Sequence, residues 1–317
     1  MKVGKIYRKK RKKTLGEIVF ICVMLAIPVT HFCLFWVYIN IDSIRLSFQS
    51  FDMNSGAWRY VGFMNYRTFW QELTKAESVL PKSILNSFSV FLWNDLVIVP
   101  ISVICAYVLS KKLFFASGFK VIFFLPAIIS VTVLTLVFSF MFDSTLGPVP
   151  ILLDKLGLSS WIPFEGFFAS GKTAWGMILF YGLWSGIGYD IVLVTGAITR
   201  IPEDIVEAGR IDGLTSIKEF FYITIPMIGS TIGTLLMLGT TVIFSYFLPV
   251  RLILGGDNAN SVGAGTIALY IVTNVRDAGT VQMPLGAAFG IICAIIGTPI
   301  VFICRKLIDR FLPAYEY

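Results

Sequence analysis

Long runs of hydrophobic residues alternate with shorter polar segments along most of the chain. A run of about 20 apolar residues is long enough to cross a lipid bilayer as a helix. The pattern predicts an all-α integral membrane protein with six transmembrane helices, over residues 18–39, 86–109, 119–142, 174–198, 227–250 and 285–307. We therefore expect a transmembrane domain at 18–310, between a basic tail at 1–17 and a short C-terminus at 311–317.

The composition supports this interpretation, because 56% of the residues are hydrophobic and only 14% are charged. Lysines and arginines concentrate in the tail and near the ends of the second, fourth and sixth predicted spans. Such residues favour the cytoplasmic side of a membrane. The distribution predicts a multi-pass membrane protein with both termini and segment 199–226 in the cytoplasm. We interpret the basic run Lys9–Lys13 as an anchor on anionic lipid, and not as a nucleic-acid site.

The polar segment 199–226 has the signals of two short helices joined by a turn. Pro202 suits the first turn of a helix, and Gly213 can adopt the left-handed conformation that ends one. Ser216, followed three residues later by Glu219, predicts a capping box that opens a second helix. We expect a helical pair at the membrane surface, placed where a partner outside the membrane could hold it.

The spacing of residues in this segment resembles the cytoplasmic EAA loop of ABC-importer permeases, E-A-A-x3-G-x9-I-x-L-P. Two positions depart from it conservatively, Gly209 in place of the second Ala and Ile225 in place of Leu. The string from Ile201 to Gly213 is similar to the carbohydrate-uptake branch of the family. The residues that we expect to couple the chain to its ATPase are Glu207, Ala208, Gly209, Asp212, Gly213, Ile223 and Pro226.

The resemblance implies a six-helix permease bundle with a cytoplasmic pair of coupling helices. The chain would be the transmembrane permease subunit of an ATP-driven, binding-protein-dependent importer for a sugar or oligosaccharide. The implied partners are a second permease, a cytoplasmic ATPase dimer and an extracytoplasmic solute-binding protein. ATP and magnesium would bind the ATPase, and no cofactor is expected on this chain.

Polar and aromatic residues inside the predicted spans are candidates for a substrate pathway. An acid inside a membrane normally faces a bundle interior or a wet cavity, and aromatic rings beside hydroxyls and amides suit sugars. The candidates are Trp93, Asn94, Asp95, Tyr181, Trp184, Tyr189, Asp190, Ser245 and Tyr246. Helix packing is the alternative for each, since Gly182 and Gly186 are spaced for close helix approach. No lysine or arginine lies in the middle of a span, which favours a neutral sugar.

Two other classes of protein stay open. An ion-coupled secondary transporter could use Asp95 and Asp190, and it would not need the 199–226 segment. An enzyme could use Gly166–Thr173, which fits the phosphate-binding P-loop pattern. A true P-loop follows a buried strand, however, and Pro163 argues against a central strand here.

The chain offers little for metal chemistry or nucleophilic catalysis. Its single histidine, His31, lies within the first predicted span, and its five cysteines lie in or at the ends of spans without a C-x-x-C pair. Such cysteines behave as small hydrophobic residues. We therefore expect no metal site, no disulfide and no catalytic residue.

Overall fold

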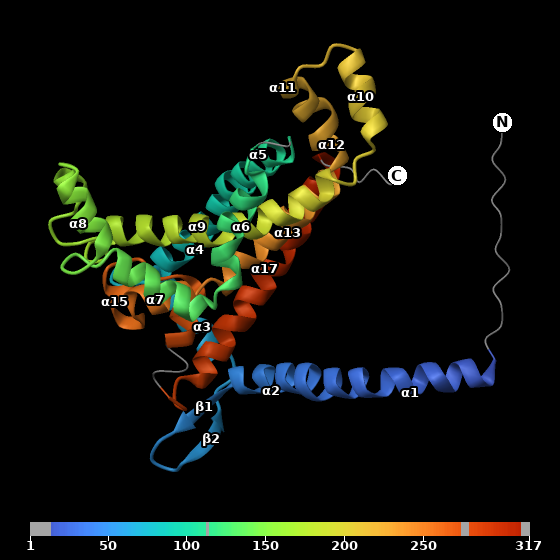
Figure 1. Cartoon of the computed structure of the whole chain (residues 1–317). Helices are drawn as coiled ribbons and strands as arrows, with labels where there is room; N and C mark the ends of the chain where they lie inside the picture. The colour runs from blue at the N-terminus through green and yellow to red at the C-terminus, as the bar shows by residue number, and fades with distance from the viewer. Residues whose placement is uncertain (1–13, 112–113, 274–278, 312–317) are drawn as a thin grey trace.

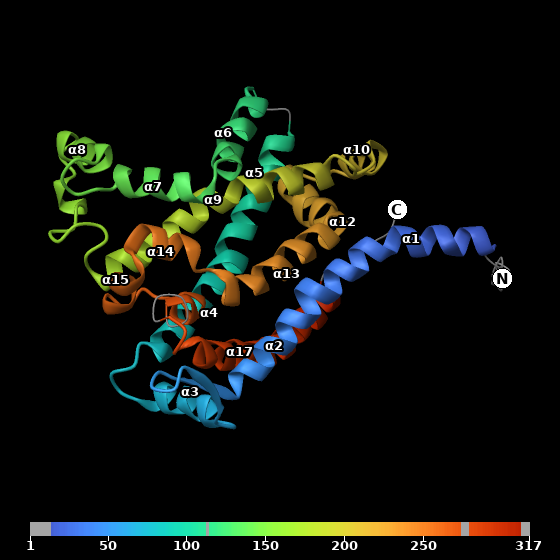
Figure 2. The same cartoon turned by 90° about the horizontal axis from the view of Figure 1, so that it is seen from below.

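The computed structural model describes residues 14–111, 114–273 and 279–311, and these are mainly helical (Figures 1 and 2). The fold class predicted from the hydrophobic pattern is therefore confirmed. Most of the predicted basic tail, including Lys9–Lys13, and residues 312–317 of the predicted C-terminus lie outside the described residues.

The first helical rod runs without interruption from Leu15 to Ser47, well beyond the predicted 18–39. It consists of α1 (Leu15–Phe32), a π-helical turn η1 (Cys33–Val37) and α2 (Tyr38–Ser47). Thr14 caps the start through a capping box with Glu17. The α2 portion packs against the last helix, whereas α1 projects away from the bundle and buries none of its side chains (Figures 1 and 2).

A two-stranded antiparallel hairpin follows the rod, a feature that the sequence analysis did not predict. Strand β1 (Gln49–Asp52) pairs with β2 (Ala57–Tyr60), with Gln49 opposite Tyr60. Helix α3 (Met64–Thr74) then packs against α17 (Met283–Phe311), the last helix of the described chain.

Three further helices are long and apolar enough to cross a membrane without a sharp bend. The first is Leu80–Ser110, made of α4 (Leu80–Trp93), a π-helical turn η2 (Asn94–Ile98) and α5 (Val99–Ser110). The others are α9 (Gly171–Ile198) and α17 (Met283–Phe311). Helices α5 and α9 pack together through a core that also includes residues of α13 (Gly229–Ser245). The buried members of this core include Val99, Val103, Ala106, Ile191, Val194, Ile228 and Leu235.

The third and fifth predicted spans are bent rather than straight. Helices α6 (Ala116–Ile128) and α7 (Val131–Met141) meet at 105°, where Pro126 precedes an extended Ile129. Segment Ser216–Met227 and α13 (Gly229–Ser245) meet at 70°. Proline removes a backbone donor and clashes with the preceding turn, so it favours a bend at such sites. The described residues thus contain four uninterrupted candidate spans, or up to six if each bent pair counts as one.

Short helices gather at one end of the bundle, at α8 (Pro148–Lys155), α14 (Leu248–Leu254), α15 (Gly256–Ser261) and α16 (Ile267–Val272). Buried side chains of α4 hold the loop before α16. The Asn86 amide donates to the carbonyls of Gly263 and Gly265 at 2.9 and 2.8 Å. The Ser87 hydroxyl accepts from the backbone N–H of Ile267 at 2.9 Å.

The two ends of the bundle carry different elements. In Figure 1, α8, α15 and the hairpin lie toward the left, while α10 (Glu203–Ile211), the last turns of α17 and the start of α1 lie toward the right. Figure 2 agrees with this arrangement. The described parts next to both termini therefore lie at the same end as the 199–226 segment.

Candidate functional site

The 199–226 segment forms two short helices around a tight turn. Helix α10 has Glu203 and Asp204 in its first turn and Arg210 in its last, which suits the helix dipole at both ends. Gly213 lies in the left-handed region at φ 80°. The N–H of Leu214 donates to the carbonyl of Gly209 at 3.0 Å, which closes the turn. The predicted left-handed conformation of Gly213 is confirmed.

The conservative departure at position 209 has a packing reason. Gly209 is buried, whereas Glu207, Ala208 and Asp212 are exposed. A Cβ atom at position 209 would lie 2.7 Å from the end of the Ile223 side chain and 3.0 Å from that of Leu214. Glycine therefore lets Ile223 and Leu214 pack directly under α10, while Glu207, Ala208 and Asp212 face outward. Pro226, in turn, lies near the bend before α13.

The predicted capping box between Ser216 and Glu219 is wrong. Helix α11 (Ser216–Glu219) begins after Thr215, and no side chain caps its first turn. Glu219 is instead only 5% exposed and is turned toward the end of α5. Its carboxylate accepts a hydrogen bond from the Lys111 ammonium and lies 3.7 Å from the Arg210 guanidinium.

Aromatic contacts join the same two elements. The Tyr107 hydroxyl of α5 donates to the carbonyl of Ser216 at 2.7 Å, and its ring lies 4.8 Å from that of Phe220. The Lys111 ammonium lies 4.6 Å from the centre of the Tyr107 ring. Partial burial depresses the pKa of Lys111, but hydrogen bonds with Glu219 and Tyr107 outweigh this effect and raise the pKa above its ordinary value. Lys111 is thus held charged at the end of α5.

Several of the predicted pathway residues come together in the bundle interior. The Trp93 indole donates to the carbonyl of Leu179 on α9 at 3.0 Å, and the Asn94 amide donates to Asp95 at 3.0 Å. The Asp95 carboxyl lies so close to Gly239 of α13 that a Cβ atom there would collide with it. Asp190 of α9 is half-buried and lies within range of the Asp95 charge.

Other candidates serve packing or lie apart from this group. Tyr181 is buried against Phe138 of α7 with ring centres 5.2 Å apart, and Trp184 stacks on the same ring at 5.9 Å. Tyr189 is exposed. The Tyr246 hydroxyl is buried beside Gly182 without a hydrogen-bond partner among the described residues.

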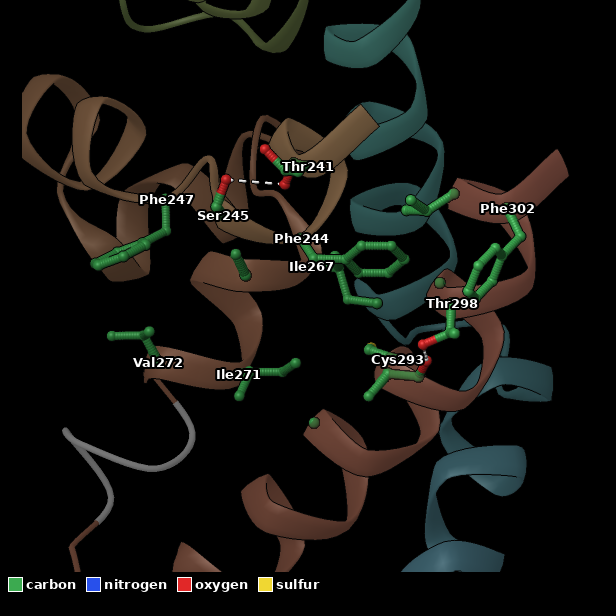
Figure 3. A pocket seen from close by; sticks show the side chains of 15 residues that line it. Thr241, Phe244, Ser245, Phe247, Ile267, Ile271, Val272, Cys293, Thr298 and Phe302 are labelled. Atoms are coloured by element: carbon green, nitrogen blue, oxygen red, sulfur yellow. Dashed lines mark hydrogen bonds between the residues drawn. The ribbon is translucent and has the colours of Figure 1, made fainter. Parts of the chain in front are cut away.

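Ser245 faces a separate groove of about 730 Å³ between α13, α16 and α17 (Figure 3). Its hydroxyl donates to the carbonyl of Thr241 at 2.9 Å. Apolar side chains dominate the lining, among them Phe244, Phe247, Ile267, Ile271, Val272 and Phe302. Apart from Ser245, the sequence analysis did not single out this groove.

The spacing of Gly182 and Gly186 predicts a close approach of another helix, but none occurs at this pair. A Cβ atom at 186 would have its nearest neighbour at 3.8 Å, and one at 182 at 3.4 Å. The close approach occurs instead at Gly188, where the backbone of α6 at Phe123 and Phe124 leaves no room for a Cβ atom. The crossing of α6 and α9 therefore depends on Gly188, which is not part of the spaced pair.

Segment Gly166–Thr173 is a turn that leads into α9. Gly166 has φ 92°, and α9 begins at Gly171. A 3₁₀ turn at Ser159–Trp161, and not a strand, precedes it in the described chain. Lys172 borders a hollow of about 370 Å³ together with Lys82 and Trp175. Among the described residues no group of three or more His, Cys, Asp or Glu side chains could hold a metal ion.

Comparisons with known proteins place the chain in a family. A family model described as "Binding-protein-dependent transport system inner membrane component" matches residues 98–313. "Probable ABC transporter permease protein YurN" of Bacillus subtilis (strain 168) is 28% identical over 271 residues, which are 80% of this chain and 85% of the relative. "Arabinooligosaccharides transport system permease protein AraP" of the same organism is 25% identical, over 89% of this chain and 86% of the relative.

A solved structure shares the fold. It is the crystal structure of a bacterial alginate ABC transporter in complex with alginate pentasaccharide-bound periplasmic protein. The match has a TM-score of 0.77 at 18% identity and covers 96% of this chain and all of the matched chain. At that identity the likeness concerns the arrangement of helices.

Proposed function

We propose that this chain, which belongs to the family of binding-protein-dependent transport system inner membrane components, imports a sugar or oligosaccharide across the bacterial cytoplasmic membrane. It acts as the permease subunit of an ABC importer. ATP and magnesium bind a separate ATPase dimer, and a second permease completes the pathway. An extracytoplasmic binding protein delivers the substrate.

The surface of segment 199–226, from here on the coupling segment, is the observation that carries this proposal. Ile211, Ile217 and Tyr222 are 86%, 71% and 73% exposed. Ile211 lies between the candidate spans, and Ile217 and Tyr222 lie on Ser216–Met227, the short arm before the bend into α13. Exposed apolar side chains that gather in this way mark a surface for another protein. Glu207 and Asp212 are exposed on the same segment. An apolar ridge flanked by acids suits a groove on the ATPase.

The orientation follows from charge and from the position of the chain ends. The sequence concentrates lysine and arginine in segments predicted to be cytoplasmic. The start of α1 and the end of α17 lie at the same end of the bundle as α10 (Figure 1). We infer that this end is cytoplasmic and that both termini lie there.

The group around Gly239 is the part of the interior best suited to a sugar. Asn94 and Asp95 of the Leu80–Ser110 helix and Asp190 of α9 supply hydrogen-bond acceptors. Trp93, directly before Asn94, supplies an aromatic surface. Tyr181 and Trp184 belong instead to the packing with α7. The carboxyl groups of Asp95 and Asp190 can accept hydrogen bonds from sugar hydroxyls, but they would repel the carboxylates of a polyuronate. No lysine or arginine lies in the middle of a predicted span to offset this repulsion, so we keep the expectation of a neutral sugar.

The names of the relatives favour a carbohydrate substrate, since AraP is described as a permease of an arabinooligosaccharides transport system. Neither of the relatives named above is an ion-coupled transporter. Two acids and one histidine would also make a sparse relay for proton coupling. An ATP-driven mechanism therefore accounts for more of the chain than a secondary transporter does.

The coupling surface is testable by affinity purification of the tagged chain from its own cells. We expect an ATP-hydrolysing subunit to copurify, and we expect the double variant Ile211→Asp with Ile217→Asp to lose it. Leu146→Asp is the matched control, because Leu146 is 84% exposed but lies in the loop after α7. Retention of the ATPase by the double variant, at equal protein levels, would remove the ridge from the mechanism.

A further inference from the structure

We propose that Glu219 is a positioning residue that fastens the coupling segment to the end of α5, so that movement of α10 and α11 reaches the bundle interior. The inference rests on the proposed function, because it concerns how the ATPase moves the permease. It assigns a role to a side chain outside the family motif.

Two cations converge on this acid from different elements. Lys111 follows the last turn of α5, and Arg210 lies in the last turn of α10. Both pair with the Glu219 carboxylate of α11. The side chain of Glu219 is almost completely enclosed, while that of Lys111 is about three-quarters enclosed. The acid thus joins α5, α10 and α11 at one point.

Three further ion pairs among the described residues are different in kind. Arg45 with Asp42 and Arg305 with Asp309 join neighbours on one helix, and Lys75, just after the end of α3, pairs with Glu72 of that helix. In each pair the cation is largely exposed. Such pairs contribute little to stability. A buried acid is different, because removing one partner leaves a charge without compensation. The Lys111–Glu219 pair is therefore the one expected to transmit force between elements.

Tyr107 reinforces the same junction without using charge. Its hydroxyl bonds to the backbone of Ser216, and its ring contacts both Phe220 and the Lys111 ammonium. A helix start that is held by its backbone and by a buried ion pair cannot shift without moving the end of α5.

Helix α5 connects this junction to the interior. It continues through η2 into α4 without a break, and η2 carries Asn94 and Asp95. It also packs along α9, which carries Asp190. A displacement of the coupling segment would therefore arrive at the polar group around Gly239 along one continuous helix.

The experiment uses the purified complex and two readouts. The first is hydrogen exchange of backbone amides in residues 203–220. The second is the amount of labelled neutral oligosaccharide taken up per ATP hydrolysed in proteoliposomes. The variants are Glu219→Gln, Lys111→Glu, Glu219→Lys and the double reversal Lys111→Glu with Glu219→Lys. Lys306→Glu is the control, since it reverses an exposed charge on α17.

We expect Glu219→Gln to speed exchange in the segment about tenfold or more, as for loss of a hydrogen bond to a charged group. Each single reversal should lower the uptake per ATP by about 2- to 30-fold, with ATP hydrolysis retained. The double reversal should recover most of it, which a variant that merely misfolds would not. The control should match the wild type in both readouts.

Unchanged exchange in Glu219→Gln would show that the junction does not hold the segment and would overturn the inference. Normal uptake per ATP in the single reversals, or no recovery in the double reversal, would overturn the coupling role. Failure of the proposed function looks different, because the wild-type complex itself would then take up oligosaccharides without ATP.

Discussion

The crossing of α6 and α9 gives the sharpest test of how the bundle is packed. A Cβ atom at position 188 would lie 2.6 Å from the carbonyl carbon of Phe123 and 3.0 Å from the Cα atom of Phe124. Both contacts are with backbone, so rotation of a side chain cannot relieve them. Gly188→Ala must therefore separate the two helices, and overpacking of this kind costs about 1–3 kcal/mol.

Gly186→Ala is the matched control on the same helix. A Cβ atom at 186 would meet its nearest neighbour, Ile98, at an ordinary 3.8 Å. The gain in helix propensity from glycine to alanine is common to both variants, so it cancels in the comparison. The difference then isolates the contact with α6 and corresponds to a factor of roughly 5 to 140 in the unfolding equilibrium constant.

The assay is reversible unfolding of the purified complex in mixed micelles, followed as denaturing detergent is added. We expect Gly188→Ala to unfold at a lower detergent fraction than the wild type, and Gly186→Ala to unfold at the same fraction or a higher one. Equal midpoints for the two variants would refute the close approach of α6 and α9.

Three further predictions concern the coupling segment, the interior and the end of the bundle that carries α8. Gly213→Ala should lower the uptake per ATP without dissociating the complex, because a Cβ at positive φ costs about 1–2 kcal/mol in this turn; the readout is uptake and hydrolysis in the same vesicles. Asp190→Asn should impair uptake more than Lys172→Ala at equal protein levels, since an intramembrane carboxyl is seldom idle, and normal transport by Asp190→Asn would place it among packing residues. Asp143 accepts hydrogen bonds from the Thr145 hydroxyl and from backbone N–H groups, and these lower its pKa below 3.8. The ionised Asp143 carboxylate therefore stabilises the folded state above pH 3.8, and this contribution is lost as the pH falls through the depressed pKa. The stability gap between wild type and Asp143→Asn, from thermal unfolding, should therefore close in acid and stay open at neutral pH.

The hydrophobic pattern was enough to predict the helical fold class because membrane spans are defined by local composition. It did not reveal the bend between α6 and α7, since the residues on both sides of Ile129 are equally apolar. The hairpin at Gln49–Tyr60 was missed because four-residue strands give a weak periodic signal beside long spans. The length and polarity of the segments were therefore enough to predict the fold class. The bends depend on tertiary packing and could not be predicted from the sequence.

Local motifs explain the main error at the coupling segment. The spacing of Ser216 and Glu219 fits a capping box, but the partner that decides the position of Glu219 is Lys111, 108 residues away. A pattern read along the chain cannot show such a contact. The lone acid among apolar residues at 217–225 was the available signal, because a charge on that face needs a partner. The glycines of α9 teach the same lesson, since only the structure shows that Gly188 faces α6.

Uptake by proteoliposomes that contain the complete complex, its binding protein and a labelled panel of neutral oligosaccharides decides whether the chain belongs to an ATP-driven importer. We expect uptake to require both ATP and the binding protein, and to persist when the proton gradient is collapsed. Uptake driven by an ion gradient in the absence of ATP would contradict this expectation.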